Sequence, residues 1–218
     1  MITETDLKAR ARRAGVVPVL TLDDAEAAVP LARALAAGGL DVMEVTLRTE
    51  AALEAIAAIA GSDVDCVIGA GTILSEGDTD AAAKAGAQFL VTPGTPASLV
   101  PALLDYPGPV IPGSSTASEA MTLGEAGFGL LKFFPAEPAG GTDFLKALAG
   151  PLPEISFMPT GGIRPDRLGA YLSLPNVVAV GGSWIAAEKD IARRGWRDIQ
   201  ARAKDAFDTA TSAIPEPR

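Results

Sequence analysis

Short apolar runs alternate along the chain with longer stretches rich in alanine, leucine and charged residues. We expect eight buried strands, and the runs that predict them begin near Val16, Asp41, Val64, Gln88, Pro109, Phe128, Ile155 and Val177. Successive starts lie 19 to 27 residues apart. Each interval therefore suits one strand followed by one helix of about three turns.

The stretches between these runs favour helix by composition. They cover residues 23–37, 50–60, 77–85, 96–104, 116–126, 142–149 and 164–172. An amphipathic helix is expected before the first strand, at 5–14, and a last helix at 195–211. Residues 214–218, which contain two prolines, should form a frayed tail.

Eight β–α units with apolar strands and no linker predict one domain over residues 1–218. The expected fold is α/β, a single (β/α)8 TIM barrel with an N-terminal helix. A doubly wound open sheet is the alternative architecture. In a barrel the chemistry lies at the C-terminal ends of the strands, so the polar residues at those ends are the candidates for function.

The formal net charge of −9 argues against a protein that binds nucleic acid or an anionic membrane. Small anions remain possible ligands, because backbone N–H groups can hold a phosphate. The first residues are polar, and no apolar stretch is long enough to span a membrane. The single cysteine, Cys66, suits a reducing compartment. We therefore expect a soluble cytoplasmic protein.

The chain has no histidine. It thus lacks the commonest general acid/base and the commonest metal ligand. With one cysteine as well, neither a zinc site nor a Cys–His nucleophile pair is available. Any chemistry must use carboxylates, lysine, hydroxyl groups or a cofactor.

Lys132 lies in the middle of an apolar run, between Leu130-Leu131 and Phe133-Phe134. Removing an ammonium group from water costs several kcal/mol even after the surroundings relax. Desolvation favours the neutral amine, which is the form that attacks a carbonyl carbon. The alternative is a lysine that reaches out of the strand end or pairs with a nearby carboxylate.

Residues 41–48 alternate with period two, which places Glu44, Thr46 and Arg48 on one face of the second strand. Because the apolar face packs on helices, we expect the polar face to point into the barrel. A carboxylate for acid/base chemistry and a guanidinium for an anionic group would then share the interior. A structural ion pair is the alternative interpretation.

Two other strand ends carry glycine pairs, Gly161-Gly162 after strand seven and Gly181-Gly182 in strand eight. Barrels commonly hold phosphate at these two positions through backbone N–H groups. We therefore expect a phosphate site there, with ordinary tight turns as the alternative. Strand three ends in Gly71-Thr72, where a ligand can approach the backbone and a hydroxyl group.

The ends of strands four and five carry no obvious chemistry. Residues 91–96 contain Pro93 in a rigid turn that we expect only to line a pocket. Residues 111–116 are expected to cap the next helix.

Together these motifs resemble the 2-keto-3-deoxy-6-phosphogluconate (KDPG) aldolase family, whose members are also active as 4-hydroxy-2-oxoglutarate (KHG) aldolases. The segments that carry the resemblance lie in order along the chain, at residues 17–19, 37–39, 44–50, 69–72, 132–137, 159–163 and 181–184. The resemblance implies the (β/α)8 fold, a homotrimer, and a reaction without metal or cofactor.

The resemblance also implies roles for individual residues. Lys132 is the expected Schiff-base lysine and Glu44 the general acid/base. The expected contacts of the substrate are Arg48, Thr72 and Thr160 for its carboxylate and hydroxyl end, Gly161, Gly162 and Ser183 for its phosphate, and Pro93 and Phe134 as pocket walls.

The residues support the same chemistry. Cleaving a carbon–carbon bond beside a ketone leaves a carbanion, and an iminium on Lys132 can accept its electrons. Glu44 is the inward carboxylate that can take the hydroxyl proton. We expect cleavage of 2-dehydro-3-deoxy-6-phosphogluconate to pyruvate and glyceraldehyde 3-phosphate. The galactonate epimer or KHG as main substrate, a phosphosugar isomerase or epimerase, and a non-catalytic phosphosugar-binding module remain as alternatives.

Overall fold

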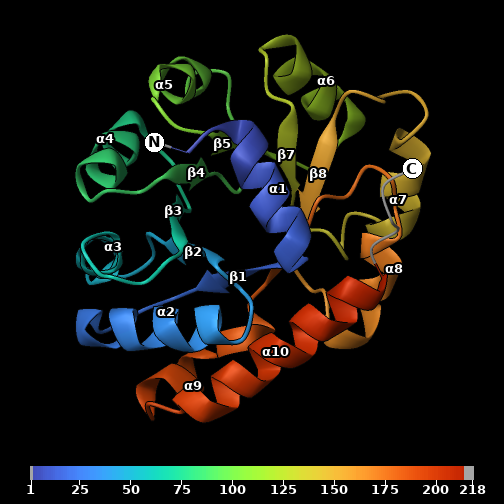
Figure 1. The fold of residues 1–218 in the computed structure, drawn as a ribbon. Helices are drawn as coiled ribbons and strands as arrows, with labels where there is room; N and C mark the ends of the chain where they lie inside the picture. Colours follow the sequence, from blue (N-terminus) through green and yellow to red (C-terminus); the bar gives the residue numbers. More distant parts are fainter. Residues whose placement is uncertain (1, 214–218) are drawn as a thin grey trace.

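Curled parallel sheets form the centre of the molecule, and helices cover their outer side (Figure 1). The computed structural model describes residues 2–213, so the expected tail at 214–218 lies outside the described part. The strands are β1 (Val16–Leu20), β2 (Val42–Thr46), β3 (Val67–Gly71), β4 (Phe89–Val91), β5 (Val110–Ile111), β6 (Gly113–Ser114), β7 (Leu130–Phe133), β8 (Ser156–Pro159) and β9 (Val180–Gly182).

Each strand begins within three residues of its expected start. The fifth expected strand is not continuous, because Pro112 divides it into β5 and β6. Six strands pair in the order β5-β4-β3-β2-β1-β9, and three pair in the order β6-β7-β8. Every pair is parallel, and two isolated parallel bridges, Phe157↔Val177 and Thr160↔Gly181, connect the second group to the β9 region.

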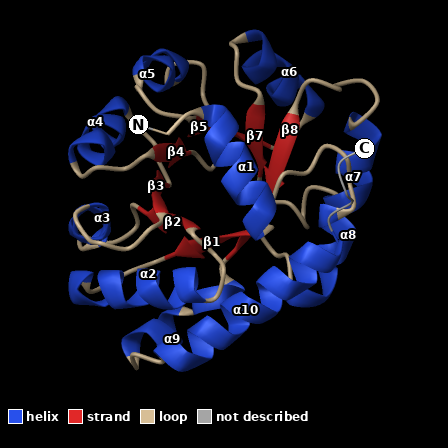
Figure 2. Cartoon of the chain, viewed as in Figure 1, coloured by secondary structure: helices blue, strands red, loops and turns tan. Residues whose placement is uncertain are grey.

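Helices lie around the outside of the strands rather than on both faces of an open sheet, which disagrees with a doubly wound fold (Figure 2). They are α1 (Glu4–Ala14), α2 (Ala28–Ala37), α3 (Ala52–Ala60), α4 (Glu76–Lys84), α5 (Val100–Asp105), α6 (Ala117–Glu125), α7 (Gly141–Leu148), α8 (Leu168–Leu172), α9 (Glu188–Ala192) and α10 (Trp196–Ala213). No helix in the described range 2–213 is both long enough and apolar enough to cross a bilayer.

Several helix boundaries differ from the expected ones. The stretch 23–37 opens with a 3₁₀ turn, η1 (Ala25–Ala27), because the Asp24 side chain accepts the backbone N–H of Glu26. The stretch 164–172 likewise opens with η2 (Pro165–Arg167). The sequence pattern missed η3 (Trp184–Ala186) and α9, which are too short to show a helical period.

The strands divide the apolar core into two clusters by side-chain parity. On β2, Met43 and Val45 pack outward with the helices, whereas Val42 joins an inner cluster with residues of the other strands. Leu7 and Ala11 of α1 also belong to the inner cluster. Helix α1 therefore lies across the N-terminal ends of the strands and closes that end, as Figure 1 shows.

Polar contacts hold α1 in this position. The Nζ atom of Lys8 donates to the carbonyl oxygen of Gly129 at 3.1 Å, and Arg10 and Arg13 both pair with Asp41 at the start of β2. The polar side of α1 thus binds the rim of the sheets while its apolar side fills their interior.

Candidate active site

Lys132 and Glu44 meet on the inner face of the sheets. The Nζ atom of Lys132 on β7 lies 3.3 Å from Oε1 of Glu44 on β2, and the two side chains are 6% and 0% exposed. The inward direction expected of Glu44 from strand periodicity agrees with this burial, and Lys132 is buried as its apolar run predicted. Lysine does pair with a carboxylate, as one alternative held, but the carboxylate is as deeply buried as the amine. The other carboxylate oxygen, Oε2 of Glu44, has no hydrogen-bond partner among the described residues.

Two glycines make room for the polar groups of the interior. A Cβ atom on Gly181 would lie 2.0 Å from Oγ1 of Thr160, and a Cβ atom on Gly71 would overlap the Glu44 carboxylate. Oγ1 of Thr160 is buried and has no partner within residues 2–213. The interior therefore presents one unpartnered carboxylate oxygen and one unpartnered hydroxyl group beside the lysine strand.

Phe134 connects the lysine to the turn after β8. Nζ of Lys132 lies 5.4 Å from the centre of the Phe134 ring, a distance that suits a cation–π contact. The same ring comes within 3.2 Å of where a Cβ atom on Gly161 would lie. The expected position of Phe134 as a wall next to Lys132 is thus consistent with the structure.

Gly161 and Gly162 form a turn in which both residues have positive φ, +103° and +78°. Glycine adopts this left-handed conformation without steric cost. The bridge Thr160↔Gly181 brings this turn next to the end of β9, where Ser183 is exposed at the start of η3. The three residues expected at the phosphate therefore belong to two neighbouring strand ends.

Glu137 binds the backbone of the glycine turn, and Tyr171 in turn binds Glu137. The hydroxyl of Tyr171 donates to Oε1 of Glu137 at 2.6 Å, and the backbone N–H of Glu137 donates to the carbonyl of Gly161 at 3.1 Å. Burial, followed by the hydrogen bond to Glu137, raises the pKa of Tyr171. The phenol therefore remains a proton donor in this pair at neutral pH.

Arg48 does not lie on the inner face of β2, and that expectation was wrong. The strand ends at Thr46, and the backbone N–H of Arg48 donates to the carbonyl of Thr46 within the turn that follows. The turn leaves Arg48 exposed, and the suggested pair with Glu44 is not among the ion pairs of the described residues. Thr46 itself donates to the carbonyl of Leu20.

Thr72 and Pro93 follow β3 and β4 at the same end of the sheets and are half-buried. Thr72 has a φ of +60°, which is unusual for a β-branched residue and sets the direction of its hydroxyl group. Eight of the ten expected site residues thus follow the C-terminal ends of strands, whereas Glu44 and Lys132 lie within β2 and β7. Arg48, Gly162 and Ser183 are exposed.

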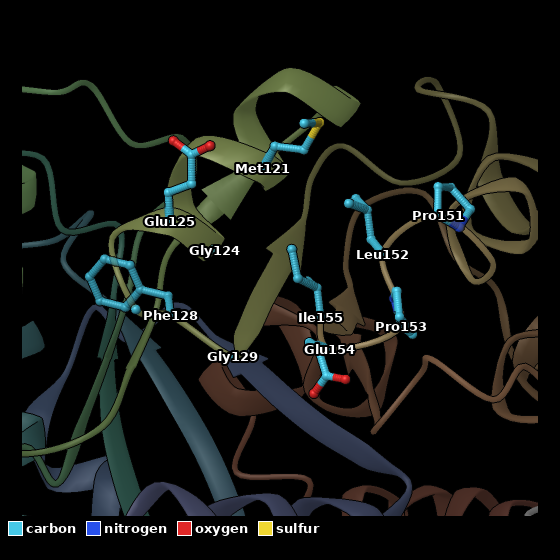
Figure 3. A pocket seen from close by; sticks show the side chains of 11 residues that line it. Met121, Gly124, Glu125, Phe128, Gly129, Pro151, Leu152, Pro153, Glu154 and Ile155 are labelled. Carbon is cyan, nitrogen blue, oxygen red and sulfur yellow. The ribbon is translucent and has the colours of Figure 1, made fainter.

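An apolar cavity of about 460 Å³ lies at the opposite end of the strands (Figure 3). Its lining includes Met121 of α6 together with Phe128 and Ile155, which precede β7 and β8. It is therefore separate from the Lys132–Glu44 pair and adds no polar group to it.

Comparison with known proteins agrees with this geometry. The family model of KDPG and KHG aldolases matches residues 7–202. The chain belongs to the KDPG and KHG aldolase family. Within the family, 2-dehydro-3-deoxy-phosphogluconate aldolase of Pseudoalteromonas atlantica is 48% identical over 191 residues, which cover 88% of this chain and 89% of the relative.

Two further relatives bear on the chemistry. The KHG/KDPG aldolase of Escherichia coli is 43% identical over 195 residues, covering 89% of this chain and 92% of its own. A crystal structure of KDPG aldolase from Legionella pneumophila, with pyruvate captured at low pH as a covalent carbinolamine intermediate, superposes with a TM-score of 0.88 at 41% identity. The match covers 91% of this chain and 97% of that one.

Proposed function

We propose that this protein is a class I aldolase that cleaves 2-dehydro-3-deoxy-6-phosphogluconate to pyruvate and glyceraldehyde 3-phosphate through a Schiff base on Lys132. The observation that carries this proposal is the buried pair of Lys132 and Glu44, whose Nζ and Oε1 atoms are 3.3 Å apart. Family membership supports the proposal, because the alignments with relatives named for this activity extend over most of the chain.

The first step forms the covalent intermediate. The amine of Lys132, after passing a proton to Glu44, attacks the keto carbon of the substrate and forms a carbinolamine. Glu44 returns a proton to the new hydroxyl group, which leaves as water. The nitrogen is now a positively charged iminium bonded to the substrate carbon.

The second step breaks the carbon–carbon bond. Glu44 takes the proton of the hydroxyl group two carbons from the iminium, and that carbon becomes the aldehyde of glyceraldehyde 3-phosphate. The electrons of the broken bond move to the iminium and give a neutral enamine. Glu44 then returns the proton to the enamine carbon, and water hydrolyses the resulting iminium to release pyruvate. The unpartnered Oε2 atom of Glu44 suits these transfers.

The remaining site residues bind the two ends of the substrate. Arg48 can hold the carboxylate through two parallel hydrogen bonds, and its exposed position lets it fold over a bound substrate. Thr72 and the unpartnered hydroxyl of Thr160 serve the same end.

The other end of the substrate carries the phosphate. It binds the backbone N–H groups of Gly161 and Gly162 and the hydroxyl of Ser183, while Pro93 and Phe134 form the walls between the two ends. The left-handed turn at the glycines supports this role, because successive N–H groups in such turns form concave anion sites.

The proposal extends to the whole chain as one domain, residues 1–218, in which both groups of strands close into one (β/α)8 barrel. The bridges Phe157↔Val177 and Thr160↔Gly181 support closure, since they join β8 to the strand that pairs with β1.

We also propose a cytoplasmic homotrimer by analogy with the family, and Met121, which is 51% exposed, is a candidate contact between subunits.

Reductive trapping tests the proposed function. Incubation with pyruvate and borohydride should add the mass of a reduced pyruvyl group to the peptide that contains Lys132, and K132A should stay unlabelled and lose nearly all activity. Labelling of K132A at the peptide that contains residue 132 would overturn the assignment of Lys132 as the Schiff-base residue. Cleavage assays with the gluconate substrate, its galactonate epimer and KHG then rank the substrates, and the E. coli relative's name makes KHG the second candidate.

A further inference from the structure

The turn after β4 binds the backbone of β6, the strand that pairs with the Lys132 strand β7, through two hydrogen bonds. The N–H of Gly113 donates to Oγ1 of Thr92 at 2.8 Å, and Oγ1 of Thr95 donates to the carbonyl oxygen of Gly113 at 3.0 Å. The two threonine hydroxyl oxygens lie 2.8 Å apart. Thr92 is completely buried.

Proton counting fixes the direction of this ring. A hydroxyl group has a single proton, and that of Thr95 is used on the Gly113 carbonyl. Thr92 must therefore donate to Thr95, while its oxygen accepts the N–H of Gly113. Both polar backbone groups of Gly113 are thus satisfied by hydroxyl groups of the neighbouring strand end.

The ring lies where the sheet is interrupted. Pro112 separates β5, which pairs with β4, from β6, which pairs with β7. In the β6–β7 register Gly113 is the direct partner of Lys132, and the N–H of Lys132 donates to the carbonyl of Pro112 at 2.9 Å. The backbone that holds Lys132 is therefore attached to β4 through Thr92 and Thr95.

Close packing makes this attachment rigid. A Cβ atom on Gly113 would lie 2.5 Å from the carbonyl carbon of Pro93, so the turn and β6 touch without an intervening side chain. Any shift of Gly113 would move the Pro112 carbonyl and with it the backbone of Lys132.

We propose that Thr92, with Thr95, is a positioning residue for the aldolase reaction: its hydroxyl fixes Gly113 and thereby the reach of Lys132 toward Glu44. This inference rests on the proposed role of Lys132 as the Schiff-base nucleophile. A misplacement of about 1 Å can slow an enzymatic step by about 100-fold, so a lost anchor beside the nucleophile has a measurable effect.

The test compares T92V, which keeps the shape but removes the hydroxyl, with T92S, which keeps the hydroxyl. The control T79V removes the hydroxyl of another buried threonine, which donates only to the carbonyl of Ser75 near the start of α4. The rate of imine formation with pyruvate, measured by borohydride trapping at several pH values, should fall by about tenfold or more in T92V. It should stay within about twofold of wild type in T92S and T79V.

A folded T92V that traps pyruvate at the wild-type rate, or a T92S that is as slow as T92V, would overturn the proposal. Equal losses in T92V and T79V would also do so, because they would indicate a general effect of stability. Should T92V not fold, T95V removes the hydroxyl of a half-buried residue and with it two bonds of the ring, and it should slow trapping measurably relative to wild type. Failure of the proposed function would differ from all of these, since wild type itself would not be labelled at Lys132.

Discussion

The carboxylate of Glu44 occupies the space that a side chain at Gly71 would need: a Cβ atom on Gly71 would stand 1.9 Å from Oε1 of Glu44. Gly71 is the last residue of β3, and its φ lies outside the left-handed region. Backbone conformation therefore does not explain the glycine. A glycine is needed here because the Glu44 carboxylate passes directly over the neighbouring strand.

This relationship predicts that G71A displaces the Glu44 carboxylate from Lys132. We expect kcat/KM for cleavage to fall by about 100-fold, on the scale of a misplaced catalytic group. The control is G77A, where a Cβ atom would meet only Oγ of Ser75 at an ordinary 3.7 Å. A G71A variant with wild-type kcat/KM would show that the carboxylate can move without effect on the reaction.

A second prediction separates covalent chemistry from proton transfer. E44Q keeps the size of the side chain but removes the base, so turnover should fall by about 100-fold or more. Trapping with pyruvate and borohydride should still label Lys132, although more slowly, because the amine remains in place while the proton transfers by Glu44 are lost. Near-normal turnover of E44Q would remove Glu44 from the proposed mechanism.

A third prediction concerns the phosphate end of the substrate. S183A should raise KM for the phosphorylated substrate about tenfold, the usual effect of losing one hydrogen bond to a charged group. Trapping of pyruvate, which has no phosphate, should be unchanged. The matched control is S173A, an exposed serine whose hydroxyl donates to the carbonyl of Ala170 on α8. Equal KM values for S183A and S173A would place the phosphate elsewhere.

A fourth prediction follows from the iminium as electron acceptor. Because the proposed mechanism moves the carbanion's electrons to the Lys132 nitrogen, cleavage should keep its full rate after extended dialysis against a chelator such as EDTA. Steady-state assays before and after dialysis, with and without added Mg²⁺ or Zn²⁺, provide the measurement. A loss of activity restored by one of these ions would favour a metal-dependent mechanism.

A fifth prediction concerns stability and pH. The carboxylate of Glu119 accepts hydrogen bonds from the backbone N–H groups of Ser115 and Thr116 at the start of α6, at 2.7 and 2.9 Å. The bond from Ser115 is the main cause that lowers the pKa of Glu119. A lowered pKa in the folded state stabilises the fold above the carboxyl group's ordinary pKa. This contribution is lost as the pH falls through the lowered value.

E119Q should therefore have a lower Tm than wild type at pH 7, and the difference should shrink as the pH falls below about 4. Thermal unfolding followed by circular dichroism at several pH values measures the difference. E125Q, at the last residue of the same helix, is the control, because no hydrogen bond of the Glu125 side chain is found in the described structure. A Tm difference for E119Q that is constant with pH would contradict the assignment.

Strand parity and topology predicted the centre of the site from the sequence. Glu44 and Lys132 are 88 residues apart, yet the period-two pattern of residues 41–48 predicted an inward Glu44, and the apolar run around Lys132 predicted a buried lysine. The pattern could not show where β2 stops. Arg48 continues the alternation of Glu44 and Thr46 in the sequence, but the chain turns after Thr46 and carries Arg48 to the surface.

Other parts of the site leave little trace in sequence periodicity. The ring of Thr92, Thr95 and Gly113 depends on hydroxyl directions in one turn and on the interruption of a strand at Pro112. Gly71 has a weak signal, since a glycine on an inward position next to a strand with an inward carboxylate indicates crowding. The short elements η3 and α9 depend on packing against α10 rather than on a helical period of their own.

Helix α1 covers one end of the interior in which we propose the reaction takes place. With Leu7 and Ala11 inserted at that end, we expect the substrate to reach Lys132 from the opposite rim, where the glycine turn lies. Because the proposed Schiff base keeps the pyruvyl group bonded to Lys132 until hydrolysis, the aldehyde should leave along this route first and pyruvate last.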